Sequence, residues 1–282
     1  MSLPAADNRR VPSPKQERSN QVTLAPSSKF WAAVSNRLSI LGGLSVFAGR
    51  FLKKVWLPPY EFKETARQTF AFGVKSLSLV SVVALVIGAV LTMQSRPTMM
   101  KFGAEAFIPA MVAISVLREL SPVLISVIVG GRVGAGIGAE LGSMRVTEQI
   151  DAMEVSALDP FNYLVVTRIV ACMVALPMLT IFGDFVALFG SYLVSRIEAG
   201  MTIQLFINSV TKSIAFSDYM PGILKTIFFG FTIGVVGCYE GFNSSGGTEG
   251  VGKSATDAVV ICSLLIILSD VIFVKLSLMF WG

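Results

Sequence analysis

Long apolar runs, separated by short polar segments, dominate the sequence from residue 76 onward. The first run, residues 76–95, contains no charged residue, and twenty helical residues at about 1.5 Å each span the ~30 Å hydrocarbon core of a bilayer. Four further runs have enough length for the same role, at 106–131, 165–195, 221–242 and 258–281. The pattern predicts an all-α integral membrane protein with five transmembrane helices.

The segment before these runs has two parts of different character. Residues 1–29 are rich in Ser, Pro, Asn and Arg and poor in large apolar side chains, so we expect a flexible cytoplasmic tail. In residues 30–60, apolar side chains recur every three or four positions, and Arg37 and Arg50 interrupt them. This favours an amphipathic helix in the membrane interface, with a transmembrane helix interrupted by Arg37 as the alternative. Residues 61–282 are expected to form the five-span membrane domain.

The composition supports a membrane protein and argues against several kinds of catalysis. Of the 282 residues, 53% are hydrophobic and 15% charged, whereas soluble domains carry about 25% charged residues. The chain has no histidine, and its three cysteines all lie in apolar stretches. The commonest metal ligand and general base is therefore missing, and we predict neither a metal site nor a cofactor.

The positive charges predict how the chain crosses the membrane. Twelve of the 23 Lys and Arg residues precede residue 76. With the N-terminus in the cytoplasm, sixteen cations fall on the cytoplasmic side and four on the opposite side, which agrees with the positive-inside rule. We therefore expect a multi-pass protein of the bacterial inner membrane, with a cytoplasmic N-terminus and a periplasmic C-terminus.

One motif suggests a different function, nucleotide binding. Residues 247–254, GTEGVGKS, match the nucleotide-binding pattern G-x-x-x-x-G-K-[ST] at every position. A P-loop also needs a buried strand before it and an α/β domain around it, whereas this motif lies between two predicted membrane helices. We therefore interpret it as a chance match in a compact cytoplasmic turn, with Ser254 or Thr256 near the start of the last helix. The chain is predicted not to be an enzyme.

A glycine ridge and a polar segment follow the second apolar run. The glycines recur every four residues, which places them on one helical face, where they permit close helix packing: Gly130, Gly134, Gly138 and Gly142. Residues 139–155 are strongly polar, yet their apolar residues can cover one side of a short helix. We expect a cytoplasmic helix there that docks into a partner. Asp159 and Pro160 predict an N-cap and a first-turn proline for the next helix.

Charged residues inside the apolar runs are the candidates for a binding site, because such groups are costly in a membrane. Arg118, Glu119 and Lys225 could line a polar pocket for a lipid headgroup, or form a structural ion pair between helices. Asp184 and Asp270 are expected to satisfy neighbouring helices. A proton-coupled secondary transporter that uses Asp184 and Asp270 is the alternative function.

Two segments carry a family resemblance. Residues 118–160, RELSPVLISVIVGGRVGAGIGAELGSMRVTEQIDAMEVSALDP, resemble the core signature of the MlaE/YrbE permeases, the membrane subunits of Mce-associated ABC transporters. Residues 241–260, GFNSSGGTEGVGKSATDAVV, resemble the second signature of that family. The resemblance covers roughly residues 60–282.

The resemblance implies a function and a set of partners. Such permeases have an interfacial helix and five spans, form homodimers, bind two separate ATPase subunits and engage a hexameric Mce-domain protein in the periplasm. Their cargo is lipid, usually phospholipid, moved between the inner and outer membranes. The helix at about 139–155 would then be the coupling helix that contacts the ATPase, through Glu140, Arg145, Thr147, Glu148, Gln149 and Asp151.

Overall fold

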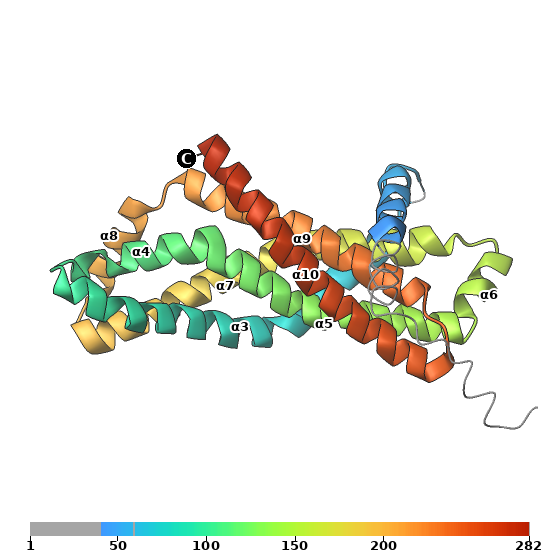
Figure 1. The fold of residues 1–282 in the computed structure, drawn as a ribbon, viewed down its shortest axis with the longest axis horizontal. Coiled ribbons are helices and arrows are strands. Elements are labelled where there is room, and N and C mark those ends of the chain that lie inside the picture. The colour runs from blue at the N-terminus through green and yellow to red at the C-terminus, as the bar shows by residue number, and fades with distance from the viewer. Residues whose placement is uncertain (1–40, 59, 282) are drawn as a thin grey trace, which may run out of the picture. The chain divides into compact units, whose positions relative to one another are not determined.

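The computed structural model describes residues 41–58 and 60–281, and this part of the chain contains helices and no strand. Residues 41–54 are helical. The later helices are α3 (Phe62–Lys101), α4 (Ile108–Ser115), α5 (Ser121–Val146), α6 (Gln149–Val155), α7 (Thr167–Ala199), α8 (Ile203–Ser213), α9 (Phe216–Phe242) and α10 (Gly247–Trp281) (Figure 1). A 3₁₀ turn, Glu105–Phe107, precedes α4, and π-helical segments precede α5 (Val116–Leu120) and α7 (Phe161–Val166).

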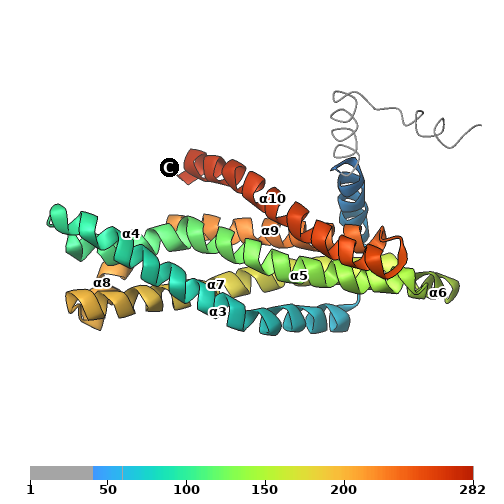
Figure 2. The same ribbon diagram turned by 60° about the horizontal axis from the view of Figure 1, so that its bottom comes forward.

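Five helical stretches are long and apolar enough to cross a membrane, and they confirm the predicted all-α fold with five spans. They are Phe62–Lys101, Glu105–Val146, Phe161–Ala199, Asp218–Phe242 and Gly247–Ser277. Several exceed the apolar runs from which they were predicted. For example, α3 begins at Phe62 and not at residue 76, because residues 62–75 contain no proline and include a run of good helix formers at residues 66–68, so the helix extends beyond the apolar run. α6 lies at one end of the bundle and α8 at the other (Figures 1 and 2).

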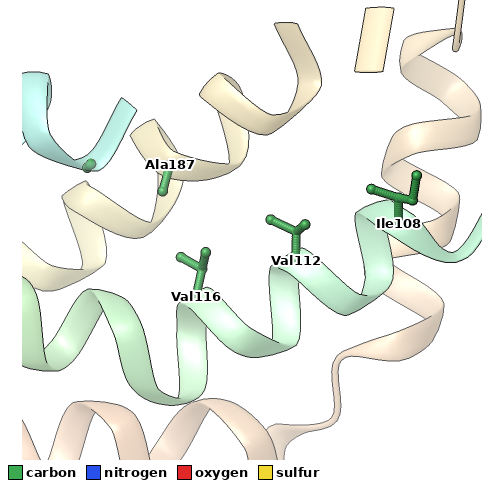
Figure 3. Packing of buried hydrophobic residues seen from close by; sticks show 5 residues of the cluster. Ile108, Val112, Val116 and Ala187 are labelled. Atoms are coloured by element: carbon green, nitrogen blue, oxygen red, sulfur yellow. The ribbon is translucent and has the colours of Figure 1, made fainter. Parts of the chain in front are cut away.

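The long helices α3 and α7 pack side by side with their backbones in close approach. Gly88 of α3 lies against the Ala187 carbonyl and Gly190 of α7 against the Leu85 carbonyl, so neither position has room for a Cβ atom. A buried apolar cluster continues this contact toward α4 and consists of Ala84, Ile108, Val112, Val116 and Ala187 (Figure 3). The Ile108, Val112 and Val116 side chains repeat every four residues and therefore present one face of the α4 region to α3 and α7.

The predicted glycine ridge of α5 faces α9 and α10. Cβ atoms added at Gly130, Gly134 and Gly138 would meet Ile233, Cys262 and the Ser254 carbonyl at 3.3, 3.3 and 3.2 Å. A Cβ atom at Gly142 would lie 3.3 Å from Ser244, in the connection between α9 and α10. Because small residues allow close backbone approach, this ridge determines how near α5 lies to α9 and α10.

The start of the last helix differs from the prediction. α10 begins at Gly247, eleven residues before the predicted start at residue 258, and Ser254 and Thr256 lie well inside it. The expected compact turn over the motif is therefore wrong. The chain reverses at the start of this helix, at Gly246 and Gly247, whose φ angles of +92° and +70° suit glycine. No proline interrupts the residues that follow, so they continue as helix.

Residues 47–54 contact the bundle through an aromatic cluster near the start of α7. The Phe47 ring lies 5.1 Å from that of Phe161 and 5.7 Å from that of Tyr239. Arg50 lies over the Phe161 ring, 4.4 Å from its centroid, in a cation–π contact. The prediction of an interfacial helix covers this segment, but residues 30–40 lie outside the described residues, as does the predicted tail at 1–29.

Candidate functional site

A buried cluster of charged residues joins three helical segments inside the membrane domain. Lys225 of α9 is 4% exposed, and its Nζ lies 2.6 Å from Glu119 Oε2 and 3.0 Å from Asp270 Oδ1 of α10. Nearby, Arg118 Nη1 lies 3.7 Å from Asp218 Oδ1. The structure therefore brings the three predicted site residues together, and it pairs both of their cations with carboxylates.

The local backbone explains how two adjacent charged residues reach this cluster. Arg118 and Glu119 lie in the π-helical segment Val116–Leu120, which ends two residues before Pro122. Pro122 has no N–H group, so the Arg118 carbonyl lacks the α-helical donor four residues later. A π-turn at this point widens the helix and is a common feature of functional sites. Gly222 of α9 packs against the Leu117 carbonyl and brings the start of α9 close to this turn.

A cavity of about 220 Å³ adjoins the cluster. Its lining mixes charged residues with apolar residues from α9 and α10: Arg118, Glu119, Pro221, Leu224, Lys225, Phe273, Leu276 and Ser277. Pockets that enclose a drug-sized ligand measure about 300 Å³ or more. This cavity therefore has space for a headgroup, while the tails of a lipid would have to lie outside it.

The charge of the cluster differs from what the sequence suggested. Sequence reasoning selected two cations and one carboxylate, Arg118, Lys225 and Glu119, as a site for a phosphate or glycerol headgroup. In the structure, Glu119, Asp218 and Asp270 neutralise these cations, and carboxylates exceed cations by one. An anionic headgroup must therefore compete with these carboxylates for the two cations. Sequence reasoning missed Asp218, although it lies only three residues before the predicted fourth span.

Asp184 of α7 has a different environment from Asp270. Asp270 neutralises Lys225, as expected for a residue that satisfies a neighbouring helix. Asp184 is 3% exposed, and neither of its carboxylate oxygens has a hydrogen-bond partner among the described residues. The Ser121 hydroxyl, at the start of α5, is likewise buried without a partner there. Among the described residues, Asp270 is therefore part of the ion-pair network, whereas Asp184 is not.

The segment predicted as one coupling helix at about 139–155 forms two helices. Its first part, through Val146, continues α5, and α6 begins at Gln149. Between them the chain turns at Glu148, whose φ of +58° is unusual for a residue with a side chain. Ile150 is 1% exposed and fixes α6 to the bundle. The helix pattern alone could not reveal the turn, because these residues favour helix on both sides of it.

The predicted coupling residues occupy two separate positions around this turn. Exposed at the turn are Arg145, Thr147, Glu148, Gln149 and Asp151. Arg145 Nη1 lies 2.5 Å from Asp151 Oδ1, which links the end of α5 to α6. Glu140 lies two helical turns earlier, and its Oε1 is 2.8 Å from Nη2 of the buried Arg168 in α7. Glu140 therefore contacts a neighbouring helix and does not join the exposed turn.

Asp159 caps the helical segment that leads into α7, as predicted. Its Oδ1 accepts hydrogen bonds from the Phe161 and Asn162 backbone N–H groups, at 3.0 and 3.4 Å. The carboxylate also forms an ion pair with Lys54. Partial burial raises the pKa of Asp159, but the Lys54 ammonium and the two N–H donors outweigh it, and the pKa lies below its usual value.

The nucleotide-binding motif has no loop in this structure. Residues 248–254 are part of the continuous helix α10, so their backbone N–H groups either form helical hydrogen bonds or lie in the first turn of the helix. A P-loop needs these groups to surround a phosphate. Because the described part of the chain also contains no sheet, the motif lacks the framework of a nucleotide site.

The fold and the charged cluster together define a class of protein. The structure has five helical stretches of membrane-spanning length, a cluster of ionisable residues lies between three of its helical segments, and an exposed polar turn projects from one end of the bundle (Figure 1). Ionisable residues inside a membrane mark pathways for substrates or ions. The chain is a multi-pass membrane protein with the features of a transport subunit.

Comparison with known proteins specifies the family. The family described as Permease MlaE matches residues 65–276. A probable ABC transporter permease protein of Rickettsia prowazekii is 37% identical over 236 residues, covering 84% of this chain and 91% of that protein. A probable ABC transporter permease protein of Synechocystis is 37% identical over 220 residues, covering 78% and 83%. The chloroplastic protein TRIGALACTOSYLDIACYLGLYCEROL 1 of Arabidopsis thaliana is 32% identical over 258 residues, covering 92% and 71%.

This chain belongs to the MlaE permease family. It is therefore an ABC transporter permease, a transport subunit and not an enzyme, as the two sequence signatures implied.

Proposed function

We propose that this permease forms a homodimer that moves phospholipids between the inner and outer membranes, driven by a separate ATPase subunit and coupled to a periplasmic Mce-domain protein. The observation that carries the proposal is the charged cluster around Lys225, beside a headgroup-sized cavity in an ABC permease. The name of the Arabidopsis relative, that of a diacylglycerol lipid, also favours a lipid cargo.

The cluster suits a ligand with both polar and apolar parts. A headgroup can exchange with the paired carboxylates, while acyl chains lie along neighbouring apolar side chains such as Leu224 and Leu276, which are 50% and 42% exposed. Because carboxylates are in excess, a headgroup that carries an ammonium as well as a phosphate can replace both kinds of partner. This favours a zwitterionic phospholipid as the cargo.

The exposed face of α10 supports the homodimer. Large apolar side chains there are between 49% and 67% exposed: Leu264, Ile267, Leu268, Val271 and Ile272. They border the face that holds Asp270, so a second copy on this surface would bring two charged clusters toward one another. A lipid between two permease subunits would then contact both cavities.

The turn between α5 and α6 is the proposed contact with the ATPase. It projects from one end of the bundle, it carries exposed charges of both signs, and Ile150 fixes it to the membrane domain (Figure 2). A rigid connection of this kind can pass the motion of a soluble subunit to α5. Glu119 lies two residues before the start of that helix. We place this end in the cytoplasm, with the N-terminus, and the C-terminus in the periplasm of a bacterial inner membrane.

The test is to purify the chain from a bacterial membrane together with the proteins and lipids that accompany it. We expect phospholipid and an ATPase subunit, with ATP hydrolysis present in the complex and absent from the isolated permease. Lys225→Met, which removes the cation shared by two carboxylates, should lower the phospholipid content. If the isolated permease hydrolysed ATP, or if the complex carried no lipid, the proposal would be wrong.

A further inference from the structure

A second polar cavity lies between α3 and α5, at the end of the bundle where α6 is found. Its volume is about 410 Å³. Its polar lining comes from Arg67, Gln68 and Lys75 of α3 and from Arg132 and Glu140 of α5, and apolar side chains complete the walls. Along α5, Arg132 is thirteen residues from Glu119, about 20 Å at 1.5 Å per residue, so this cavity is separate from the Lys225 cluster.

The charge of this cavity is positive. Three of its lining residues are cations and one is a carboxylate. That carboxylate, Glu140, already binds Arg168 at 2.8 Å. Glu64 lies 3.4 Å from Arg67, but no carboxylate of residues 41–58 and 60–281 lies within ion-pair distance of Lys75 or Arg132. Arg132 instead donates a hydrogen bond to Ser76 Oγ at 3.1 Å, which holds its guanidinium at the cavity.

An apolar stripe leads away from the cavity along α3. Leu79, Val82 and Val86 follow Lys75 at helical spacing and are 39%, 65% and 49% exposed. From Lys75 to Val86 is about 16 Å along the helix, close to half of the ~30 Å hydrocarbon core. On α5, Leu124 and Ile128 continue from Arg132 in the same direction, and Leu124 is 37% exposed. The cavity therefore opens onto an apolar surface one leaflet deep.

We propose that this cavity binds the phosphate-bearing headgroup of an anionic phospholipid from the leaflet on the α6 side, with the acyl chains along the stripe of α3. Lys75 and Arg132 bind the phosphate, and Gln68 supplies a further hydrogen-bonding group. Free phosphate could use the same cations, but it would leave the apolar stripe without a role. This site goes beyond the proposed transport site, because the two differ in position and in the sign of their excess charge.

The experiment measures lipid binding to the purified full chain in a neutral detergent by native mass spectrometry. The probes are phosphatidylglycerol, phosphatidylcholine and inorganic phosphate. We expect phosphatidylglycerol to bind more tightly than phosphatidylcholine, and inorganic phosphate at the same concentration not to displace it. Lys75→Gln should weaken phosphatidylglycerol binding about fivefold, the effect of one basic residue at an anionic surface, and Lys75→Gln with Arg132→Gln about 25-fold.

Matched variants separate this site from general effects. Lys101→Gln removes an exposed cation at the other end of α3 and should leave phosphatidylglycerol binding unchanged. Lys75 is itself exposed on the helix surface, so its substitution should preserve the melting temperature, and Lys75→Arg should retain binding. Equal affinity for the two lipids, displacement by inorganic phosphate, or unchanged binding in the double variant would each overturn the proposal.

One further variant distinguishes the two proposals. Lys225→Met alters the proposed transport site and should leave phosphatidylglycerol binding at the α3–α5 cavity intact. Loss of that binding in Lys225→Met, with normal binding in Lys75→Gln, would assign the lipid to the Lys225 cluster and overturn the second site. Failure of ATP-dependent transport with normal lipid binding would instead contradict only the proposed function.

Discussion

The cluster around Lys225 and the cavity between α3 and α5 arrange their charged residues in opposite ways. Around Lys225, the cation is buried and two carboxylates neutralise it. Between α3 and α5, Lys75 and Arg132 are exposed at a cavity, and the one carboxylate in the lining of that cavity, Glu140, binds Arg168 instead. The difference shows two ways to keep a charge at a membrane. In the Lys225 cluster, carboxylates of the protein neutralise the cation. At the α3–α5 cavity, the cations can contact water, lipid headgroups or a partner.

The largest expected effect of a single substitution is at the buried cluster. Lys225→Met leaves Glu119 and Asp270 without their shared cation, and the loss of one partner from a buried ion pair costs about 3 kcal/mol or more. Thermal unfolding in detergent should show a clear decrease in stability. Adding Glu119→Gln and Asp270→Asn to the same chain should recover part of the loss. Lys75→Gln, at the exposed cavity, should change stability by less than about 0.5 kcal/mol. Similar losses of stability in Lys225→Met and Lys75→Gln would contradict this difference between the two regions.

The next effect concerns the exposed turn. Glu148→Arg reverses a charge on the proposed ATPase contact and should reduce the ATPase rate of the complex about tenfold, within the range of ordinary coupling energies. Lys101→Glu, an equivalent reversal at the far end of α3, serves as the control and should have no effect on this rate. A normal rate and normal subunit binding in Glu148→Arg would show that the turn does not carry the coupling.

A smaller effect tests why the α3–α5 cavity is positive. Arg168→Gln removes the cation that binds Glu140, so the freed carboxylate adds an uncompensated negative charge at the cavity. Phosphatidylglycerol binding should weaken about fivefold, as for the loss of one basic residue. Combining it with Glu140→Gln should restore binding, because the carboxylate is then absent. If Arg168→Gln weakened binding and Glu140→Gln did not restore it, the effect would come from the loss of Arg168 packing.

The smallest effect is a pH dependence at Asp159. Its folded-state pKa lies below the usual value of 3.8, so the charged form stabilises the fold above that pH. This contribution is lost as the pH falls through the lower, folded-state pKa. The stability difference between the natural chain and Asp159→Asn should therefore be constant near neutral pH and shrink below about pH 4. Lys54→Gln, which removes the ion-pair partner, should reduce the same dependence. A difference that does not change with pH would contradict the ion pair.

The spans were predictable because each is a local property of the sequence. Twenty uncharged residues at 76–95 permit few structures besides a membrane helix, and Asp159 before Pro160 is a local capping signal. The partners of Lys225 were not predictable, since Glu119 and Asp270 lie 106 and 45 residues away and their meeting depends on how three helices rotate. The π-helical segment before Pro122 and the left-handed Glu148 also left no clear signal in the helix pattern.

The residues that meet at the α3–α5 cavity were not predictable from the sequence either. Lys75 was counted only among the basic residues before residue 76, and Arg132 only among the sixteen cations assigned to the cytoplasmic side. The structure places both on one cavity, because α5 continues as a helix past Arg132 and runs beside the first turns of α3. Charge counting predicts which side of the membrane such residues face, but it cannot predict which residues lie together.

The most direct test of the transport proposal uses proteoliposomes that contain the permease with its ATPase subunit and a fluorescent phospholipid. The account predicts lipid transfer to the partner Mce protein only when ATP is supplied, and no transfer with a proton gradient alone. Transfer driven by the proton gradient without ATP, and abolished by Asp184→Asn, would contradict the account and would identify a secondary transporter.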